Sequence, residues 1–177
     1  MEHRLIEKQV LYSGKKVRLE LHHMEDEEGT RHVREVCVHP GAVVILPLIT
    51  PTRILLIWNT RPSLNTKLIE LPAGTLEKDE DPMNCAGREL LEETGYLAGR
   101  LQPLIFHYPA PGILTERIYA FIARDLKHQG QQLDEGEEIE VLPTNLDDAI
   151  DMIRNGEIVD GKTIAALLMY EKFYKGA

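Results

Sequence analysis

The stretch GTLEKDEDPMNCAGRELLEETGY, Gly74 to Tyr96, places three glutamates within five residues, shortly before a glycine. Asp81 followed by Pro82 is typical of a helix start, because the carboxylate can accept hydrogen bonds from free backbone N–H groups and proline fits the first helical position. Gly95 is typical of a helix end. The stretch therefore predicts a helix over 82–94. It carries Glu89, Glu92 and Glu93.

The apolar and acidic side chains of this helix fall on different faces at about 100° per residue. The apolar face is formed by Met83, Ala86, Gly87, Leu90 and Leu91. Glu89 and Glu93 are about one turn apart, where like charges repel, and Arg88 is the one basic residue of the helix. A divalent ion removes this repulsion, since Mg²⁺ is commonly held by carboxylates together with substrate phosphate oxygens. The pattern indicates a metal–phosphate site, with a solvated acidic face as the alternative.

Composition limits the function classes. The chain has 177 residues and a formal net charge of -9, which argues against an electrostatic nucleic-acid binder. Two cysteines are too few for a disulfide framework, and the longest apolar runs are far shorter than a membrane span. The first ten residues lack the apolar core of a secretory signal. We therefore expect a cytoplasmic protein that acts on a small molecule and binds neither nucleic acid nor membrane.

Strand patterns flank the predicted helix. Apolar and polar residues alternate from Arg4 to about Val38, and the buried runs GAVVILPLI and RILLIWNT, joined by a turn at 50–52, predict a central hairpin. Further strands are predicted at LQPLIFHY, RIYAFIAR and EIEVLP, and helices at NLDDAIDMIRNG and KTIAALLMYEKFY. This order favours an α/β or α+β sandwich over a doubly wound parallel sheet.

The spacing of the whole opening stretch resembles the signature of Nudix hydrolases at every fixed position. These positions are Gly74, Glu80, Arg88, Glu89, Leu90, Glu92, Glu93, Gly95 and Tyr96. Outside it, LIELPAG, YPAPG with Glu116, EGEEIEV and GEIVDGKTIAAL look like the ADP-ribose pyrophosphatase and nucleoside diphosphate sugar branch of that family.

The resemblance implies a fold as well as a site. Members of this branch have an α/β fold, a three-layer α/β/α sandwich with a mixed central sheet and a loop–helix–loop catalytic motif. N-terminal antiparallel strands are exchanged across a homodimer. We therefore expect a dimer-forming strand module at 1–39 and a Nudix hydrolase domain at 40–177.

The resemblance also implies a set of metal ligands. Glu89 and Glu93 would be the principal ligands of Mg²⁺, or of Mn²⁺ in its place. Glu92 would be a further ligand or catalytic support, and the backbone carbonyl of Ala73 would complete the site. Two more residues, Arg88 and Glu80, would align the carboxylates by ion pairing.

A general base is expected in the loop LDEGEEIE before the last strand. Matching this loop to the family branch places Glu135 as the base and Glu137 as an additional, catalytic metal ligand. Glu138 remains a competitor for the base, because acidic density alone does not distinguish the three.

Substrate contacts are expected outside the helix. By resemblance, Arg34 reaches the nucleotide base region, in some members from the partner subunit, and Arg61 lies near the phosphates or terminal ribose. Glu70 and Glu116 would order the sugar or the catalytic water. Pro111 has the spacing shared by members that hydrolyse ADP-ribose.

These residues together predict Mg²⁺-dependent hydrolysis of the pyrophosphate bond of ADP-ribose or a related nucleoside diphosphate sugar, giving a nucleoside monophosphate and a sugar phosphate. One alternative is a GDP-mannose or broad nucleoside diphosphate sugar pyrophosphatase. An alternative of another class is a non-catalytic domain that senses ADP-ribose.

Overall fold

The computed structural model describes residues 3–133, 136 and 138–176 and divides into two compact units. Unit 1 comprises Met1–Gly41 and Tyr108–Arg117, and unit 2 comprises Ala42–His107 and Ile118–Ala177. The chain therefore leaves unit 2 once, to contribute the segment Tyr108–Arg117 to the N-terminal unit. Among the described residues, no helix has the length and apolar character needed to cross a membrane.

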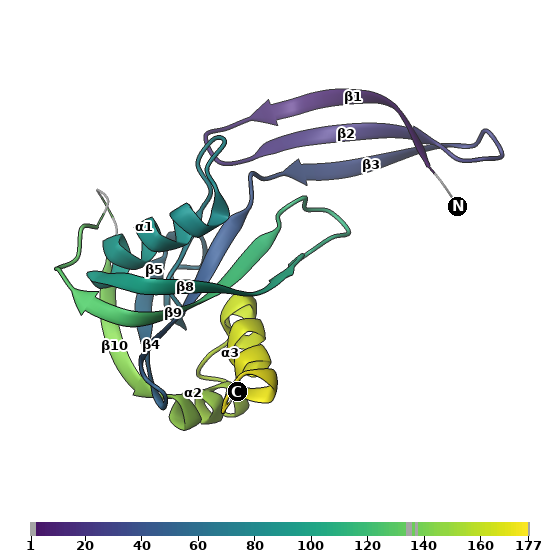
Figure 1. The fold of residues 1–177 in the computed structure, drawn as a ribbon. Helices are drawn as coiled ribbons and strands as arrows, with labels where there is room; N and C mark the ends of the chain where they lie inside the picture. The colour runs from purple at the N-terminus through teal and green to yellow at the C-terminus, as the bar shows by residue number, and fades with distance from the viewer. Residues whose placement is uncertain (1–2, 134–135, 137, 177) are drawn as a thin grey trace. The chain divides into compact units, whose positions relative to one another are not determined.

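Unit 1 is built on an antiparallel sheet of three strands in the order β1-β2-β3 (Figure 1). The strands are β1 (Arg4–Ser13), β2 (Arg18–Glu25) and β3 (Arg31–Val38). The segment Tyr108–Arg117 binds to the end of β3, because the Cys37 N–H donates to the Ile113 carbonyl at 2.8 Å and the Thr115 N–H donates to the Cys37 carbonyl at 3.0 Å. The segment from Arg4 to Val38, in which apolar and polar residues alternate, thus forms the predicted strands.

Unit 2 contains a mixed sheet of seven strands in which the central order is β10-β5-β4-β9-β8, with β6 paired to β5 and β7 to β4. The strands are β4 (Ala42–Thr50), β5 (Arg53–Arg61), β6 (Thr66–Glu70), β7 (Ala73–Thr75), β8 (Tyr96–His107), β9 (Ile118–His128) and β10 (Ile139–Asn145). β4 and β5 form the predicted hairpin. β4 runs parallel to β9, whereas the other pairs are antiparallel.

Helices cover both faces of this sheet (Figure 1). Side chains of β4 alternate between them: Val43 and Ile45 pack with the helix α1 (Pro82–Thr94), whereas Val44 belongs to the cluster that includes α2 (Leu146–Arg154) and α3 (Gly161–Phe173). A strand buried on both faces reads as a continuous apolar run, which explains GAVVILPLI. The predicted α/β/α sandwich with a mixed central sheet is confirmed for unit 2.

The bounds of α1 agree with the predicted helix over 82–94. The Asp81 side chain accepts hydrogen bonds from the N–H groups of Met83 and Asn84, and Gly95 ends the helix in the left-handed region at φ 75°. The predicted apolar face is wrong at Met83, which is 40% exposed. The buried side chains are instead Cys85, Ala86, Leu90, Glu93 and Thr94. The helix therefore turns one carboxylate toward the sheet.

Candidate active site

Glu93 is a buried carboxylate held by the backbone of β7. Its residue is only 3% exposed, and its Oε2 accepts a hydrogen bond from the Ala73 N–H at 2.8 Å. The Pro72 carbonyl just before it accepts from the Ile45 N–H, which fixes the turn between β6 and β7 against β4. A buried polar group requires such a partner. The solvated acidic face considered for the helix is thus wrong for Glu93.

Gly74 is required by a close approach of Glu89 to the backbone. A Cβ atom built on Gly74 would lie 1.9 Å from Glu89 Cδ and 2.0 Å from its Oε1, far inside van der Waals contact. The backbone of Gly74 lies outside the left-handed region, so its conformation alone does not demand glycine. The Glu89 carboxylate therefore lies in a cradle that only a residue without a side chain leaves open.

We expect Gly74→Ala to lower kcat roughly 100-fold while the protein stays folded. The added methyl group displaces the Glu89 carboxylate, and small displacements of ligand groups commonly cost 10- to 100-fold in activity. Steady-state kinetics and far-UV circular dichroism measure the two effects. Gly87→Ala is the matched control, because its Cβ meets only Leu101 Cδ1 at 3.6 Å, an ordinary contact. Equal activity of the two variants would contradict the cradle.

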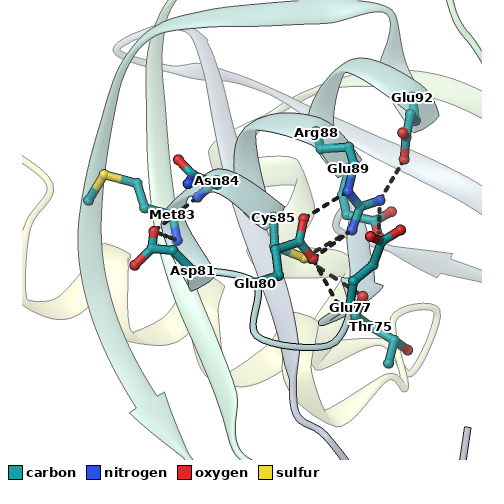
Figure 2. Close-up of polar contacts among 10 residues, drawn as sticks. All are labelled: Thr75, Glu77, Glu80, Asp81, Met83, Asn84, Cys85, Arg88, Glu89 and Glu92. Atoms are coloured by element: carbon teal, nitrogen blue, oxygen red, sulfur yellow. Dashed lines mark hydrogen bonds and ion pairs between the residues drawn. The ribbon is translucent and has the colours of Figure 1, made fainter.

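Arg88 joins the carboxylates of Glu80, Glu89 and Glu92 (Figure 2). Its Nη1 donates to Glu89 Oε1 and to Glu92 Oε2, both at 2.8 Å. Its Nε and Nη2 donate to the two oxygens of Glu80 at 3.0 and 3.1 Å. One guanidinium therefore orients three carboxylates. The ion pairing expected of Arg88 and Glu80 is confirmed.

The pKa values of Arg88 and Glu80 move apart because of this contact. Hydrogen bonds from Arg88 lower the pKa of Glu80 to about 2, from an ordinary value of 4.5, and the same contact raises the pKa of Arg88. A lowered pKa means that the folded state favours the ionised carboxylate, so this stabilisation is present above pH 4.5 and is lost as the pH falls toward 2.

We expect Glu80→Gln to lower the free energy of unfolding above pH 4.5, with a difference from the parent that shrinks to nothing near pH 2. Urea unfolding at several pH values measures it. The exposed neighbour Glu77, replaced by glutamine, should show no such pH-dependent difference. A pH-independent difference for Glu80→Gln would show that the ion pair with Arg88 is not its cause.

A second charged cluster surrounds Glu70 at the end of β6. Glu70 is 1% exposed and accepts two hydrogen bonds from Arg61, at 2.7 Å from Nε and 2.5 Å from Nη2. Lys162, at the start of α3, donates to Glu70 at 2.5 Å and pairs with Asp160 at 3.0 Å. Glu70 raises the pKa of Arg61. The structure thus brings Arg61 and Glu70 together, with Glu70 buried.

Sequence reasoning gave no role to Lys162 and Asp160. They lie in GEIVDGKTIAAL, a stretch that resembles the family branch as a whole. The available signal was a lysine directly after an Asp–Gly helix start, where its side chain could reach back toward the sheet. Without the position of β6, the sequence does not indicate which carboxylate this lysine contacts.

The remaining expected substrate residues lie in unit 1. Arg34 lines a hollow together with Gly112 and Ile113, which follow Pro111 in the chain. Glu116 lies 3.4 Å from the Nδ1 of His39, measured from Oε1. Sequence positions more than 70 residues apart therefore meet in one compact unit.

Two of the expected catalytic residues, Glu135 and Glu137, lie outside the described residues. Their competitor Glu138 accepts a hydrogen bond from Thr60 Oγ1 at 3.3 Å through its Oε2. The segment before them is bound to the end of α1, because Gln131 Nε2 donates to the Glu93 carbonyl at 2.6 Å and the Gln132 N–H donates to the Glu92 carbonyl at 3.0 Å. The segment that leads to the acidic loop is therefore hydrogen-bonded to the backbone carbonyls of Glu92 and Glu93 at the end of α1.

The same segment explains why position 95 is glycine. A Cβ on Gly95 would lie 2.7 Å from the Gln131 nitrogen and 2.7 Å from the Gly130 carbonyl carbon. Gly95 therefore serves both as the left-handed helix end and as the surface on which residues 130 and 131 rest.

The donor set fits a hard divalent ion. Glu89, Glu92 and Glu93 supply only oxygen atoms, which Mg²⁺ and similar ions prefer, and the open cradle at Gly74 keeps the backbone close to Glu89. In the part of the chain that the structure describes, no three such side chains already converge on one point. Glu89 and Glu92 point to Arg88 instead, and Glu93 to the Ala73 N–H.

Comparisons with known proteins agree with this geometry. The model of the NUDIX domain matches residues 38–167. An ADP-ribose pyrophosphatase of Bacillus subtilis (strain 168) is 36% identical over 169 residues, which cover 94% of this chain and 91% of the relative. A methanol dehydrogenase activator of Bacillus methanolicus is 35% identical over 168 residues, with the same coverage.

Two further matches extend the comparison. A GDP-mannose pyrophosphatase of Escherichia coli O139:H28 (strain E24377A / ETEC) is 38% identical over 153 residues, which cover 81% of this chain and 80% of the relative. A crystal structure of an ADP compounds hydrolase superposes with a TM-score of 0.87 at 22% identity, over 99% of this chain and 96% of that one, and shows a common fold. The family match, the full-length relatives and the intact carboxylate motif show that this chain belongs to the NUDIX hydrolase family.

Proposed function

We propose that this protein hydrolyses the pyrophosphate bond of ADP-ribose or a related nucleoside diphosphate sugar, with Mg²⁺ as the divalent ion and Mn²⁺ as a substitute. The products are a nucleoside monophosphate and a sugar phosphate. The observation that carries the proposal is the complete set of Glu89, Glu92 and Glu93, held by Arg88 and the Ala73 N–H in a chain similar to an ADP-ribose pyrophosphatase.

NUDIX hydrolases generally use divalent metal ions. In our proposal Glu89, Glu92 and Glu93 hold the metal together with the carbonyl of Ala73 and with Glu137. A bound divalent ion supplies positive charge against the diphosphate and acidifies water. Arg88 keeps two of these carboxylates aligned through its ion pairs with Glu89 and Glu92.

The acidic loop supplies the base in this proposal. Glu135 would take the proton from the attacking water, and Glu138 is its competitor. The attachment of Gln131 and Gln132 to the carbonyls of Glu93 and Glu92 supports a role of this loop at the helix. A general base must reach its proton within hydrogen-bond distance, so a short tether to α1 favours this assignment.

Cationic groups near Glu70 suit the anionic substrate. Arg61 is 36% exposed at its side chain although it is bound to Glu70, so part of this side chain faces solvent. Lys162 lies beside it on the same carboxylate. We propose that this pair contacts a phosphate or the terminal sugar. Arg34, Pro111 and Glu116 remain proposed substrate contacts by resemblance to the family branch.

Turnover of a substrate panel tests the proposal. The purified protein would be incubated with ADP-ribose, ADP-glucose, GDP-mannose and UDP-glucose in Mg²⁺, and the products identified by chromatography. Release of a nucleoside monophosphate from at least one compound is the expected result. Binding of ADP-ribose without release of a monophosphate would favour the sensing domain and overturn the proposal.

GDP-mannose is the second candidate substrate, because a GDP-mannose pyrophosphatase is similar over 80% of its own length. The same panel separates it from ADP-ribose by the ratio of kcat/KM values.

Both cysteines are free thiols, which agrees with the reducing cytoplasm that we propose as the location.

We further propose a homodimer that exchanges its N-terminal strands. β1 is exposed along its whole length, and its apolar side chains Leu5, Ile6, Val10, Leu11 and Tyr12 are 42 to 61% exposed. Such a strand needs a cover, and a second copy supplies one. Light scattering of the double variant Leu11→Lys, Tyr12→Lys should give a monomer where the parent gives a dimer. Phe173→Lys, also exposed but in unit 2, is the control; a monomeric parent overturns the proposal.

A further inference from the structure

The short connection between β6 and β7 carries the backbone group that holds Glu93. It consists of Leu71 and Pro72, and Ala73 follows as the first residue of β7. The pairing of β6 with β5 ends at Glu70, so the strand ladder does not extend to the Leu71 N–H. Leu71 is fully buried, and a buried N–H group requires an acceptor. The position of this connection therefore depends on a partner from another segment.

Thr163, in the first turn of α3, supplies that acceptor. Its Oγ1 accepts from the Leu71 N–H at 2.8 Å and donates to Asp160 Oδ2 at 2.6 Å, so the hydroxyl acts both as acceptor and as donor. Asp160 Oδ2 also accepts from the Thr163 N–H at 3.0 Å, as the N-cap of the helix. Thr163 is fully buried, which shields these hydrogen bonds from water. The start of α3 and the Leu71 backbone are thus fixed to each other.

The chain from Leu71 to Ala73 is stiff enough to transmit this constraint. Pro72 has a fixed φ and no N–H group, and its carbonyl accepts from the Ile45 N–H at 2.8 Å. The Ala73 N–H then donates to Glu93 Oε2 at 2.8 Å. The clusters formed by α3 and by α1 lie on opposite faces of the sheet. A hydroxyl on one face therefore constrains a carboxylate that belongs to the other.

We propose that Thr163 is a positioning residue for Glu93, which it orients across the sheet by fixing Leu71 and, through it, the Ala73 N–H. This inference deepens the proposed function and rests on it for the metal ion that Glu93 would hold. Removal of a group that orients a metal ligand through a hydrogen bond typically costs 10- to 100-fold in metal affinity or activity. Thr163 acts through the backbone rather than on the carboxylate itself, so the lower end of this range applies.

The test measures Mn²⁺ binding to the full-length protein without substrate, from the electron paramagnetic resonance signal of the free ion. Thr163→Val keeps the shape of the side chain and removes only the hydroxyl. We expect this variant to bind Mn²⁺ with a dissociation constant about tenfold higher than that of the parent. Thr163→Ser restores the hydroxyl and should bind Mn²⁺ like the parent. Steady-state hydrolysis should show the same order in the half-activating concentration of Mg²⁺.

Ala166→Gly is the matched control for a loss of stability in the same helix. Ala166 is a buried residue of α3 about one turn beyond Thr163. Glycine destabilises a helix interior but leaves the Thr163 hydroxyl in place. The variant should therefore unfold at a lower urea concentration and keep the Mn²⁺ dissociation constant of the parent. Parent-like Mn²⁺ binding by Thr163→Val, or an equal weakening in Ala166→Gly, would overturn the inference.

Failure of the proposed function is distinguishable from failure of this inference. If the parent binds Mn²⁺ but hydrolyses no nucleoside diphosphate sugar, the proposed function fails and the Mn²⁺ comparison still applies. If the parent binds no Mn²⁺, amide hydrogen exchange tests the positioning without a metal. Exchange at Ala73, relative to the amides of β9 in the same sample, should become faster in Thr163→Val and not in Thr163→Ser. An unchanged relative rate in Thr163→Val would overturn the inference.

Discussion

Replacing Glu93 by glutamine is expected to lower kcat about 10³-fold, with little change in stability. Loss of one preorganised charged group in an active site typically costs on the order of 10²- to 10³-fold, and Glu93 is the most buried of the three helix glutamates in its motif. The glutamine keeps an oxygen that can accept from the Ala73 N–H, so the turn before β7 retains its contact. What is lost is the negative charge toward a metal ion.

The measurement is single-turnover hydrolysis in Mg²⁺, together with urea unfolding of the same samples. Glu157→Gln, an exposed glutamate in the loop between α2 and α3, is the matched control and should keep the parent kcat. If Glu93→Gln retained more than about a tenth of the parent rate, Glu93 could not be a principal metal ligand.

Replacing Glu70 by glutamine is expected to destabilise the fold by about 3 kcal/mol, the lower end of the cost of removing one partner from a buried ion pair. Arg61 and Lys162 both point at Glu70, so its neutralisation leaves two cations close to each other. The lower end applies because Arg61 is partly exposed and water can solvate it.

Lys162→Met provides the comparison, measured by the same urea unfolding. It leaves Glu70 with the two hydrogen bonds from Arg61, so its cost should be the smaller of the two. In the double variant Glu70→Gln, Lys162→Met the costs should not add, since removing the lysine relieves the repulsion that the first change creates. Additive costs, or an unchanged stability of Glu70→Gln, would contradict this account of the cluster.

The catalytic helix could be predicted closely because its ends are encoded locally. Asp81, Pro82 and Gly95 each act on backbone groups within a few residues, so the pattern predicts both ends of α1 without knowledge of the rest of the chain. The motif spacing likewise pointed to Glu89, Glu92 and Glu93 as candidate metal ligands. The pairing of Arg88 with Glu80 spans only eight residues and could also be predicted from the sequence.

Contacts between distant segments could not be predicted in the same way. The hydrogen-bond partner of Glu93 is the Ala73 N–H, and the third member of the Arg61–Glu70 cluster is Lys162, 92 residues beyond Glu70. The helical periodicity placed Met83 on the buried face because it considers only the polarity of side chains. Whether an apolar side chain is buried depends on whether the sheet extends far enough to cover it, and Met83 is exposed.

The sequence alone determined the helix, the carboxylates that it carries and the family to which they point, because these follow from side-chain chemistry at short spacing. Only the tertiary structure decided which carboxylate is buried, why position 74 has no side chain, and which cations share Glu70. The physical reason is that burial and partnership depend on segments that come together only when the chain folds, and no local pattern records their positions.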